Sequence, residues 1–161
     1  LAHLSGEMFK RATGLDLVHV PYKGSGPAKT DVIGGHVLMM FDNTASALPA
    51  VQGGQLRALA ITSPTRNKAA PNLPTMIESG YPDFVAEGWY GLFAPANTPA
   101  DIVDRLHAEM VKLLKLPDVV ERFGTLGLDI IGNTPKEFAA QVKNDMVRLG
   151  KVIKDAGITA E

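Results

Sequence analysis

The chain has 161 residues, a formal net charge of -1 and a hydrophobic fraction of 45%. This balance of charges gives no reason to expect nucleic acid or an anionic membrane surface as a partner, and the hydrophobic fraction is that of a packed globular protein. Cysteine is absent, which excludes disulfides, thiolate metal sites and a cysteine nucleophile.

Neither a membrane span nor a secretion signal is predicted within these residues. No apolar run approaches the roughly 18 residues that a spanning helix needs. The chain begins Leu1-Ala2-His3, and no basic segment followed by an apolar one comes after it. We therefore expect a fragment or a processed product.

The first predicted element is a helix over residues 3–13. Leu4, Met8 and Phe9 recur on one helical face, and Gly14 has the position of a C-cap. His3 lies at the start of this helix, where a cap-region role is the simpler interpretation and a ligand contact the alternative.

Next comes a strand, a tight turn and a helix. Residues 17–20 alternate as a short strand does, and Pro21 ends it. Gly24-Ser25-Gly26-Pro27 then opens a helix that runs to Gly34, with Ser25 or Gly26 as the N-cap and Pro27 at or near the first helical position.

This turn predicts an anion site. The start of a helix presents unpaired backbone N–H groups and the positive end of a dipole. Lys23 adds a full positive charge beside them, and Tyr22 stands at the end of the preceding strand. We expect a carboxylate to bind at Tyr22, Lys23, Gly24, Ser25 and Gly26.

A dinucleotide loop is the alternative interpretation of the same residues. Gly24-x-Gly26 follows a strand and precedes a helix, and Asp42 lies where an acid that binds ribose is expected. However, Lys29 holds the place of the third glycine, and Pro27 removes an amide that a pyrophosphate would use. The pattern therefore disfavours a dinucleotide.

A second strand end is predicted to join the site. Residues 37–41 form a continuous apolar run, typical of a parallel strand covered on both faces, and Asp42-Asn43 ends it. Ligands of open α/β sheets bind at the carboxyl ends of the strands, so we expect Asp42 and Asn43 to meet Lys23 at one crevice. Equally, these two side chains could only cap the next helix, over residues 45–52.

A third apolar strand, over residues 56–62, follows Gly53-Gly54 and completes a βαβαβ pattern, which implies parallel strands. Residues 63–82 are rich in Pro, Asn and Ser and are predicted to connect, with one short helix over residues 74–79. Arg66 in this segment is expected to be solvated, although a ligand contact is the alternative.

The only tryptophan lies in an extended segment over residues 85–95. Gly88 and Gly91 allow the torsion that a hinge absorbs, although glycines in a strand can equally mark close packing. We expect Trp89 and Tyr90 to pack in the core near this hinge.

Three helices are predicted in the last third of the chain. The first has Thr98 as its N-cap and Pro99 at its first position, and the second opens at Pro117 and runs to about Leu126. A brief strand over residues 128–131 precedes the last helix, which Thr134 caps. Their charged residues are predicted to form solvated faces.

No enzyme motif is present. The sequence has no Gly-x-Ser-x-Gly elbow, no His-Glu-x-x-His and no phosphate loop, and its four histidines are scattered: His3, His19, His36 and His107. We therefore expect no catalytic residue, no metal and no cofactor.

The chain resembles the Bug family, the extracytoplasmic receptors of tripartite tricarboxylate transporters. The resemblance covers almost the whole chain and is carried, in the family's order, by VHVPYKGSGPAKTDVIGGHVLMMFDN, ALPAVQGGQLRALAITSPTR, PNLPTMIESGYPDF and WYGLFAPANTPADIVDRL. Receptors of this family are about twice as long, which implies that their N-terminal part precedes Leu1.

The resemblance implies an α/β fold like that of type II periplasmic binding proteins, with two α/β lobes and mostly parallel sheets, here truncated at the N-terminus. Residues 1–86 would form most of the second lobe. Residues 87–161 would form the strand that crosses back and the C-terminal part of the first lobe. His3 and Ser5 would lie close to the ligand.

The implied function is a periplasmic solute-binding receptor, not an enzyme, that captures a small organic acid between its lobes. The implied ligands are dicarboxylates, tricarboxylates, amino acids or aromatic acids, and the implied partners are membrane permease subunits. We expect a monomer. The alternative is a dinucleotide-binding or other small-molecule-binding α/β domain of an enzyme or sensor.

Overall fold

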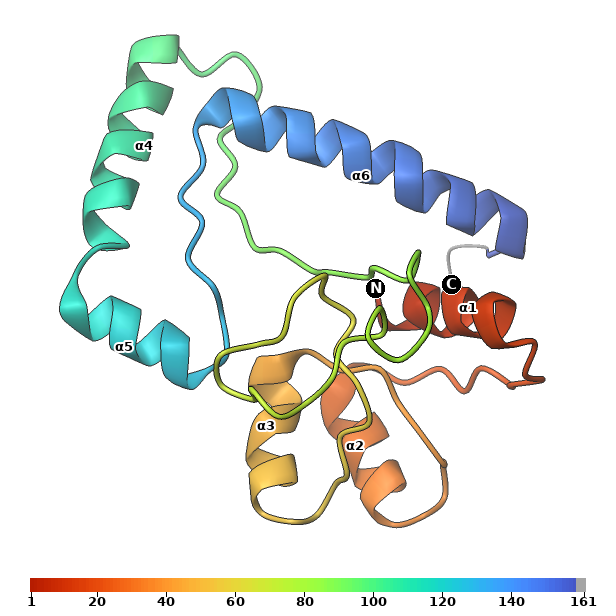
Figure 1. Cartoon of the computed structure of the whole chain (residues 1–161). Coiled ribbons are helices and arrows are strands. Elements are labelled where there is room, and N and C mark those ends of the chain that lie inside the picture. The colour runs from red at the N-terminus through yellow and green to blue at the C-terminus, as the bar shows by residue number, and fades with distance from the viewer. Residues whose placement is uncertain (159–161) are drawn as a thin grey trace. The chain divides into compact units, whose positions relative to one another are not determined.

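The computed structural model describes residues 1–158 and divides the chain into two compact units, Leu1–Gly88 and Trp89–Glu161. The first unit contains three helices, α1 (Ala2–Thr13), α2 (Ser25–Ile33) and α3 (Thr44–Gln52) (Figure 1). The second contains α4 (Ala100–Leu113), α5 (Pro117–Thr125) and α6 (Pro135–Ala156). The assignment of residues 1–86 and 87–161 to two lobes stays a prediction.

Helix α1 begins and ends close to where the sequence predicts. Gly14 adopts the left-handed conformation and donates its N–H to the Lys10 carbonyl, so its prediction as the C-cap is confirmed. The predicted apolar face is used, because Met8 and Phe9 pack against the core of the first unit.

That core is small and aromatic. Met76, Phe84 and Ala86 are buried at its centre. The Phe9 ring meets Phe84 edge-on at 6.3 Å and Phe41 at 5.8 Å between centroids. These pairs fix α1 against the segments that follow α2 and α3.

The predicted strands are wrong as strands within residues 1–158. Residues 17–20, 37–41, 56–60, 85–95 and 128–131 belong to no β ladder, and the β pairing in this part of the chain is one isolated parallel bridge, between Ile61 and Thr75. Hydrogen bonds do reach the predicted third strand from both sides. Met76 N–H donates to the Ile61 carbonyl at 2.9 Å, and Ala86 N–H donates to the Thr62 carbonyl at 2.9 Å.

The reason is that alternation specifies an extended backbone but not its neighbour. A ladder needs a second strand about 4.8 Å away along its whole length. The side chain of Val18 is 87% exposed and that of Leu38 is 95% exposed, so nothing in the described residues covers them. The expectation that residues 37–41 are buried on both faces is therefore also wrong here.

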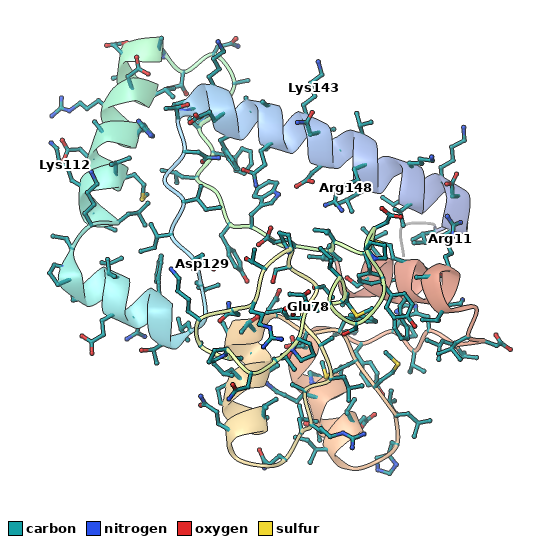
Figure 2. All side chains as sticks on the ribbon, in the orientation of Figure 1. Arg11, Glu78, Lys112, Asp129, Lys143 and Arg148 are labelled. Atoms are coloured by element: carbon teal, nitrogen blue, oxygen red, sulfur yellow. The ribbon has the colours of Figure 1, made fainter. Side chains whose placement is uncertain are left out.

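The predicted short helix over residues 74–79 is instead a single hydrogen-bonded turn held by side chains. Thr75 N–H donates to Glu78 Oε2 at 2.8 Å, Glu78 N–H donates to Thr75 Oγ1 at 3.0 Å, and Thr75 also forms the bridge to Ile61. Arg66 is not merely solvated, because its Nε donates to Glu78 Oε2 at 2.9 Å. Glu78 lies in the loop region between α3 and α4 (Figure 2).

In the second unit, the start of α4 differs from the prediction. Pro99 is the N-cap, and the Thr98 hydroxyl turns back to donate to the Pro95 carbonyl at 2.8 Å. Thr98 therefore makes its own local turn and does not cap the helix. Helix α5 opens on Pro117 as predicted.

Trp89 ties the segment after Gly88 to α6. Its ring meets Phe138 edge-on at 5.0 Å between centroids, and its Nε1 donates to Asp145 Oδ2 at 2.7 Å. Arg148, on α6 (Figure 2), donates to the other oxygen of Asp145 at 3.0 Å. Trp89 thus packs as expected, whereas Tyr90 is 78% exposed and is not a core residue.

Helix α6 has the capping box that the sequence predicts. Thr134 is its N-cap, and Glu137 accepts hydrogen bonds from the Thr134 N–H at 2.8 Å and the Thr134 hydroxyl at 2.7 Å. These bonds, assisted by the nearby His107, hold the pKa of Glu137 below its ordinary value of 4.5.

The lowered pKa predicts that Glu137 stabilises the fold less in acid. A carboxyl group whose pKa is lowered in the folded state stabilises the fold at pH values above its ordinary pKa. This stability is lost as the pH falls through the folded-state pKa. We expect wild type to be more stable than Glu137→Gln at neutral pH, and the difference to shrink below pH 4.5. Urea unfolding of both proteins across this range checks it. A difference that does not change with pH would contradict it.

Candidate functional site

Gly24 sets the start of α2. It is the N-cap, with φ 106° and ψ 173°, and its N–H donates to the Tyr22 carbonyl at 2.9 Å. The prediction of Ser25 or Gly26 as the N-cap is wrong, because the sharp turn at Gly24 lets the helix begin at Ser25. Pro27 is consequently the third helical residue, not the first.

Asn43 sets the start of α3. It is the N-cap, but its side chain makes no capping hydrogen bond, and its carbonyl accepts from the N–H groups of Ser46 and Ala47. Asp42 accepts from the Asn43 N–H through Oδ1 at 2.8 Å. Asp42 Oδ2 is buried and has no hydrogen-bond partner. The two side chains therefore do not cap α3.

The two helix starts meet. Ser25 Oγ lies 2.9 Å from Ser46 Oγ, which joins the first turn of α2 to the first turn of α3. Figure 1 shows the two helices side by side with these ends together. The structure thus joins the helix that follows Tyr22 and Lys23 to the helix that follows Asp42 and Asn43. That these residues form one ligand site stays a prediction.

Lys29 crosses between the two helices. Its Nζ donates to the Ser46 carbonyl at 2.7 Å and lies 3.0 Å from Ser46 Oγ. Neither Lys29 nor Ser46 was selected from the sequence as a site residue. A usable signal was present, since Lys29 is four residues after Ser25 and so shares its helical face.

Both helix starts carry backbone donors that the helices do not use. Helical geometry leaves the N–H groups of Ser25 and Gly26 without partners in α2, and those of Thr44 and Ala45 without partners in α3. The dipole of each helix places partial positive charge at the same end. This end of the first unit can chemically accept an anion.

Tyr22 and Lys23 flank this end in different ways. The Tyr22 hydroxyl donates to Asp31 Oδ2 at 2.6 Å, and this hydrogen bond is the main reason that the pKa of Tyr22 lies above its ordinary value of 10.0. Tyr22 has therefore given its only side-chain donor to α2 and can offer a ligand an oxygen lone pair or its ring. Lys23 is exposed and makes no ion pair within residues 1–158.

His3 and Ser5 have local partners. The rings of His3 and His19 stack at 3.6 Å between centroids. Ser5 is buried, and its hydroxyl donates to the Leu1 carbonyl at 3.1 Å. Their predicted closeness to a ligand stays a prediction.

Residues 1–158 offer neither a cluster of metal-ligating side chains nor a helix that could span a membrane. They contain no group of three or more His, Cys, Asp or Glu side chains placed to hold a metal ion. None of their helices combines the length and apolar character needed to cross a membrane.

Solved structures place the fold in the class of periplasmic binding proteins. The periplasmic binding protein BugD is 36% identical and matches with a TM-score of 0.86 over 99% of this chain and 54% of its own. Rpa4515 of R. palustris, solved with adipate, is 34% identical, with a TM-score of 0.89 over 98% and 53%. MatC of Rhodopseudomonas palustris, solved with malate, is 33% identical, with a TM-score of 0.83 over 95% and 53%. The predicted fold class is confirmed by these matches.

The chain belongs to the tripartite tricarboxylate transporter receptor family, whose model matches residues 1–158. This confirms the resemblance to the Bug receptors that the sequence motifs indicate. The chain spans about half the length of most of the curated relatives it matches, 47% and 48% for two of them.

Proposed function

We propose that the protein is a solute-binding receptor that captures a small carboxylate at the joined starts of α2 and α3. The observation that supports this most directly is the contact between Ser25 and Ser46, 2.9 Å between their hydroxyl oxygens. It brings two sets of unpaired backbone N–H groups to one place.

The chemistry of binding follows from the residues at this place. A ligand carboxylate accepts from the amides of Ser25 and Gly26, and the Lys23 ammonium offsets its charge. Gly24 leaves the approach to these amides free of a side chain. The unpaired Asp42 Oδ2 accepts from a hydroxyl or amine of the ligand, and Asn43 lies beside it. A buried acceptor without a partner is costly, so a ligand donor there adds affinity.

The ligands of two relatives support this class of solute. Rpa4515 was solved with adipate and MatC with malate. Each is an acid with two carboxyl groups, and malate adds a hydroxyl of the kind that Asp42 would accept from. We propose that the protein binds acids of this class as a receptor, without turnover.

The family also supports a location and a partner. Its members are receptors of tripartite tricarboxylate transporters, and BugD is a periplasmic binding protein. We therefore propose that the protein acts in the periplasm, as a monomer, and delivers its ligand to membrane permease subunits. Closure would bury the ligand and complete the surface that the permease binds.

The experiment is to release and titrate the ligand. Native mass spectrometry of the natural full-length protein, followed by denaturation, should release a small carboxylic acid. Calorimetry should then show binding of malate or adipate and no binding of adipamide, which keeps the adipate chain but has no charge. Equal binding of adipate and adipamide would contradict a carboxylate site.

Lys23→Ala tests the charge at the turn. We expect it to weaken carboxylate binding by roughly 1.5–3 kcal/mol, the size of a hydrogen bond to a charged group. Lys143→Ala is the matched control, because Lys143 is also exposed but lies on α6. It should leave the affinity unchanged. Calorimetry measures both variants. Unchanged affinity in Lys23→Ala would remove Lys23 from the site.

A further inference from the structure

Lys29 is the one charged side chain within residues 1–158 that donates a hydrogen bond from α2 to α3. Its Nζ lies 2.7 Å from the Ser46 carbonyl oxygen and 3.0 Å from Ser46 Oγ, and the same Oγ lies 2.9 Å from Ser25 Oγ. Ser46 therefore accepts hydrogen bonds from the Lys29 ammonium and also contacts Ser25, the first residue of α2. Removal of the ammonium would leave the contact between Ser25 and Ser46 as the hydrogen bond described between the two helices.

The surroundings of this ammonium leave its charge uncompensated. Its hydrogen-bond partners are a carbonyl and a hydroxyl, both neutral, and Lys29 forms no ion pair within residues 1–158. Asp31, the nearest acid along α2, is hydrogen bonded to Tyr22. Lys29 is half-buried, so water screens its charge less than that of the exposed Lys23.

The local balance of charge favours an anion with more than one negative charge. Lys23 and Lys29 precede and follow Ser25 in the sequence. The contact between Ser25 and Ser46 joins the starts of α2 and α3, which are the positive ends of their dipoles. One carboxylate balances one ammonium. Asp42, at the start of α3, accepts from the Asn43 N–H but keeps its negative charge, so it offsets one of the two ammonium groups. The other ammonium and the two dipole ends, each about half a charge, leave an excess that one carboxylate does not balance.

We propose that Lys29 is the positioning residue of the candidate site and sets its preference for dicarboxylates over monocarboxylates. It does so without touching the ligand, by holding the Ser46 turn against Ser25 and by supplying a second positive charge. This inference rests on the proposed function, because it concerns the selectivity of the carboxylate site.

The test compares adipate with hexanoate, which has the same six-carbon chain and one carboxylate. Calorimetry on the natural full-length protein measures both ligands with wild type, Lys29→Met, Lys29→Gln and Lys29→Arg. Met keeps the length of the stem without charge, Gln keeps a donor without charge, and Arg keeps both. Thermal unfolding without ligand reports whether each variant is folded as wild type is.

We expect wild type to prefer adipate, and Lys29→Met and Lys29→Gln to lower the adipate-to-hexanoate affinity ratio by roughly tenfold, the scale of one partly screened charge. Lys29→Arg should restore most of the ratio. The adipate affinity of wild type should also fall more steeply with salt than that of Lys29→Met.

Two other results overturn the inference in distinguishable ways. If wild type prefers adipate and Lys29→Met keeps the same ratio, Lys29 does not set the preference. This conclusion also holds if both acids weaken equally and the ligand-free melting temperature falls, since the role is then structural. If wild type binds neither acid, the proposed function itself fails, and the inference fails with it.

Discussion

Gly91→Ala is expected to destabilise the second unit by about 1–3 kcal/mol or more, the usual cost of overpacking. A Cβ at this position would lie 2.1 Å from Cζ of Phe138 and 2.7 Å from its Cε1. Carbon atoms cannot approach so closely, and the Phe138 ring is itself held by Trp89 and Phe93. The chain or the ring must therefore move.

Urea unfolding followed by the fluorescence of Trp89, the only tryptophan, measures this directly. Trp89 lies in the cluster that the substitution disturbs, so the signal reports on the affected unit. Gly124→Ala is the matched control in the same unit, because no atom lies within 4 Å of its added Cβ and it sits inside α5. Helix propensity there should raise stability by up to about 1 kcal/mol.

A double variant separates overpacking from backbone effects. Phe138→Leu removes the ring that the new Cβ would meet. Gly91→Ala should then cost less in the Phe138→Leu background than in wild type, a coupling that a double-mutant cycle measures. Equal costs in the two backgrounds would mean that the clash with Phe138 is not the cause.

The sequence predicts helix ends well because their signals are local. Thr134 and Glu137 stand three residues apart, and the capping box needs nothing else. Gly14 likewise ends α1 wherever the helix packs. Thr98 failed as a cap for a reason that is also local, since its hydroxyl donates to the Pro95 carbonyl instead.

Strands are predicted less well because their defining partner lies elsewhere. The apolar run at residues 37–41 is a good strand candidate, yet Leu38 is 95% exposed and the run forms no ladder within residues 1–158. The chain matches only 53% of the length of Rpa4515. The sequence of these residues cannot state which neighbour would cover them.

The candidate site shows the same division. The sequence predicts that the two turns share one site from the rule that strand ends share one edge of a sheet. Within residues 1–158 no such sheet is present, and the contact that joins the two helix starts is the one between Ser25 and Ser46. The spacing that puts Lys29 on the same helical face as Ser25 is visible in the sequence, but its bond to Ser46 is not, because that bond depends on how α2 and α3 pack. Whether Tyr22 faces a ligand or Asp31 also depended on tertiary structure.

Gly24→Ala is expected to have the largest effect on the site. Gly24 has φ 106° and ψ 173°, a region of backbone space that only glycine adopts readily. A side chain there costs about 1–3 kcal/mol. The chain can relieve this strain only by rotating the turn. The rotation changes the directions of the Ser25 and Gly26 amides and moves them away from Ser46. We therefore expect loss of carboxylate binding in addition to lower stability.

Gly26→Ala is the control two residues away. Its backbone is helical and no atom outside its chain neighbours lies within 4 Å of an added Cβ. The added Cβ meets only the steric restriction on a residue before proline, here Pro27, so the loss of stability should be smaller than in Gly24→Ala. Calorimetry with adipate and thermal unfolding, applied to both variants, separate strain from obstruction. Binding lost in Gly24→Ala but kept in Gly26→Ala means that the turn geometry creates the site. Binding lost in both means that a ligand needs the space beside these amides. Binding kept in Gly24→Ala would place the carboxylate elsewhere, because the amides of Ser25 and Gly26 cannot keep their directions once Gly24 leaves this conformation.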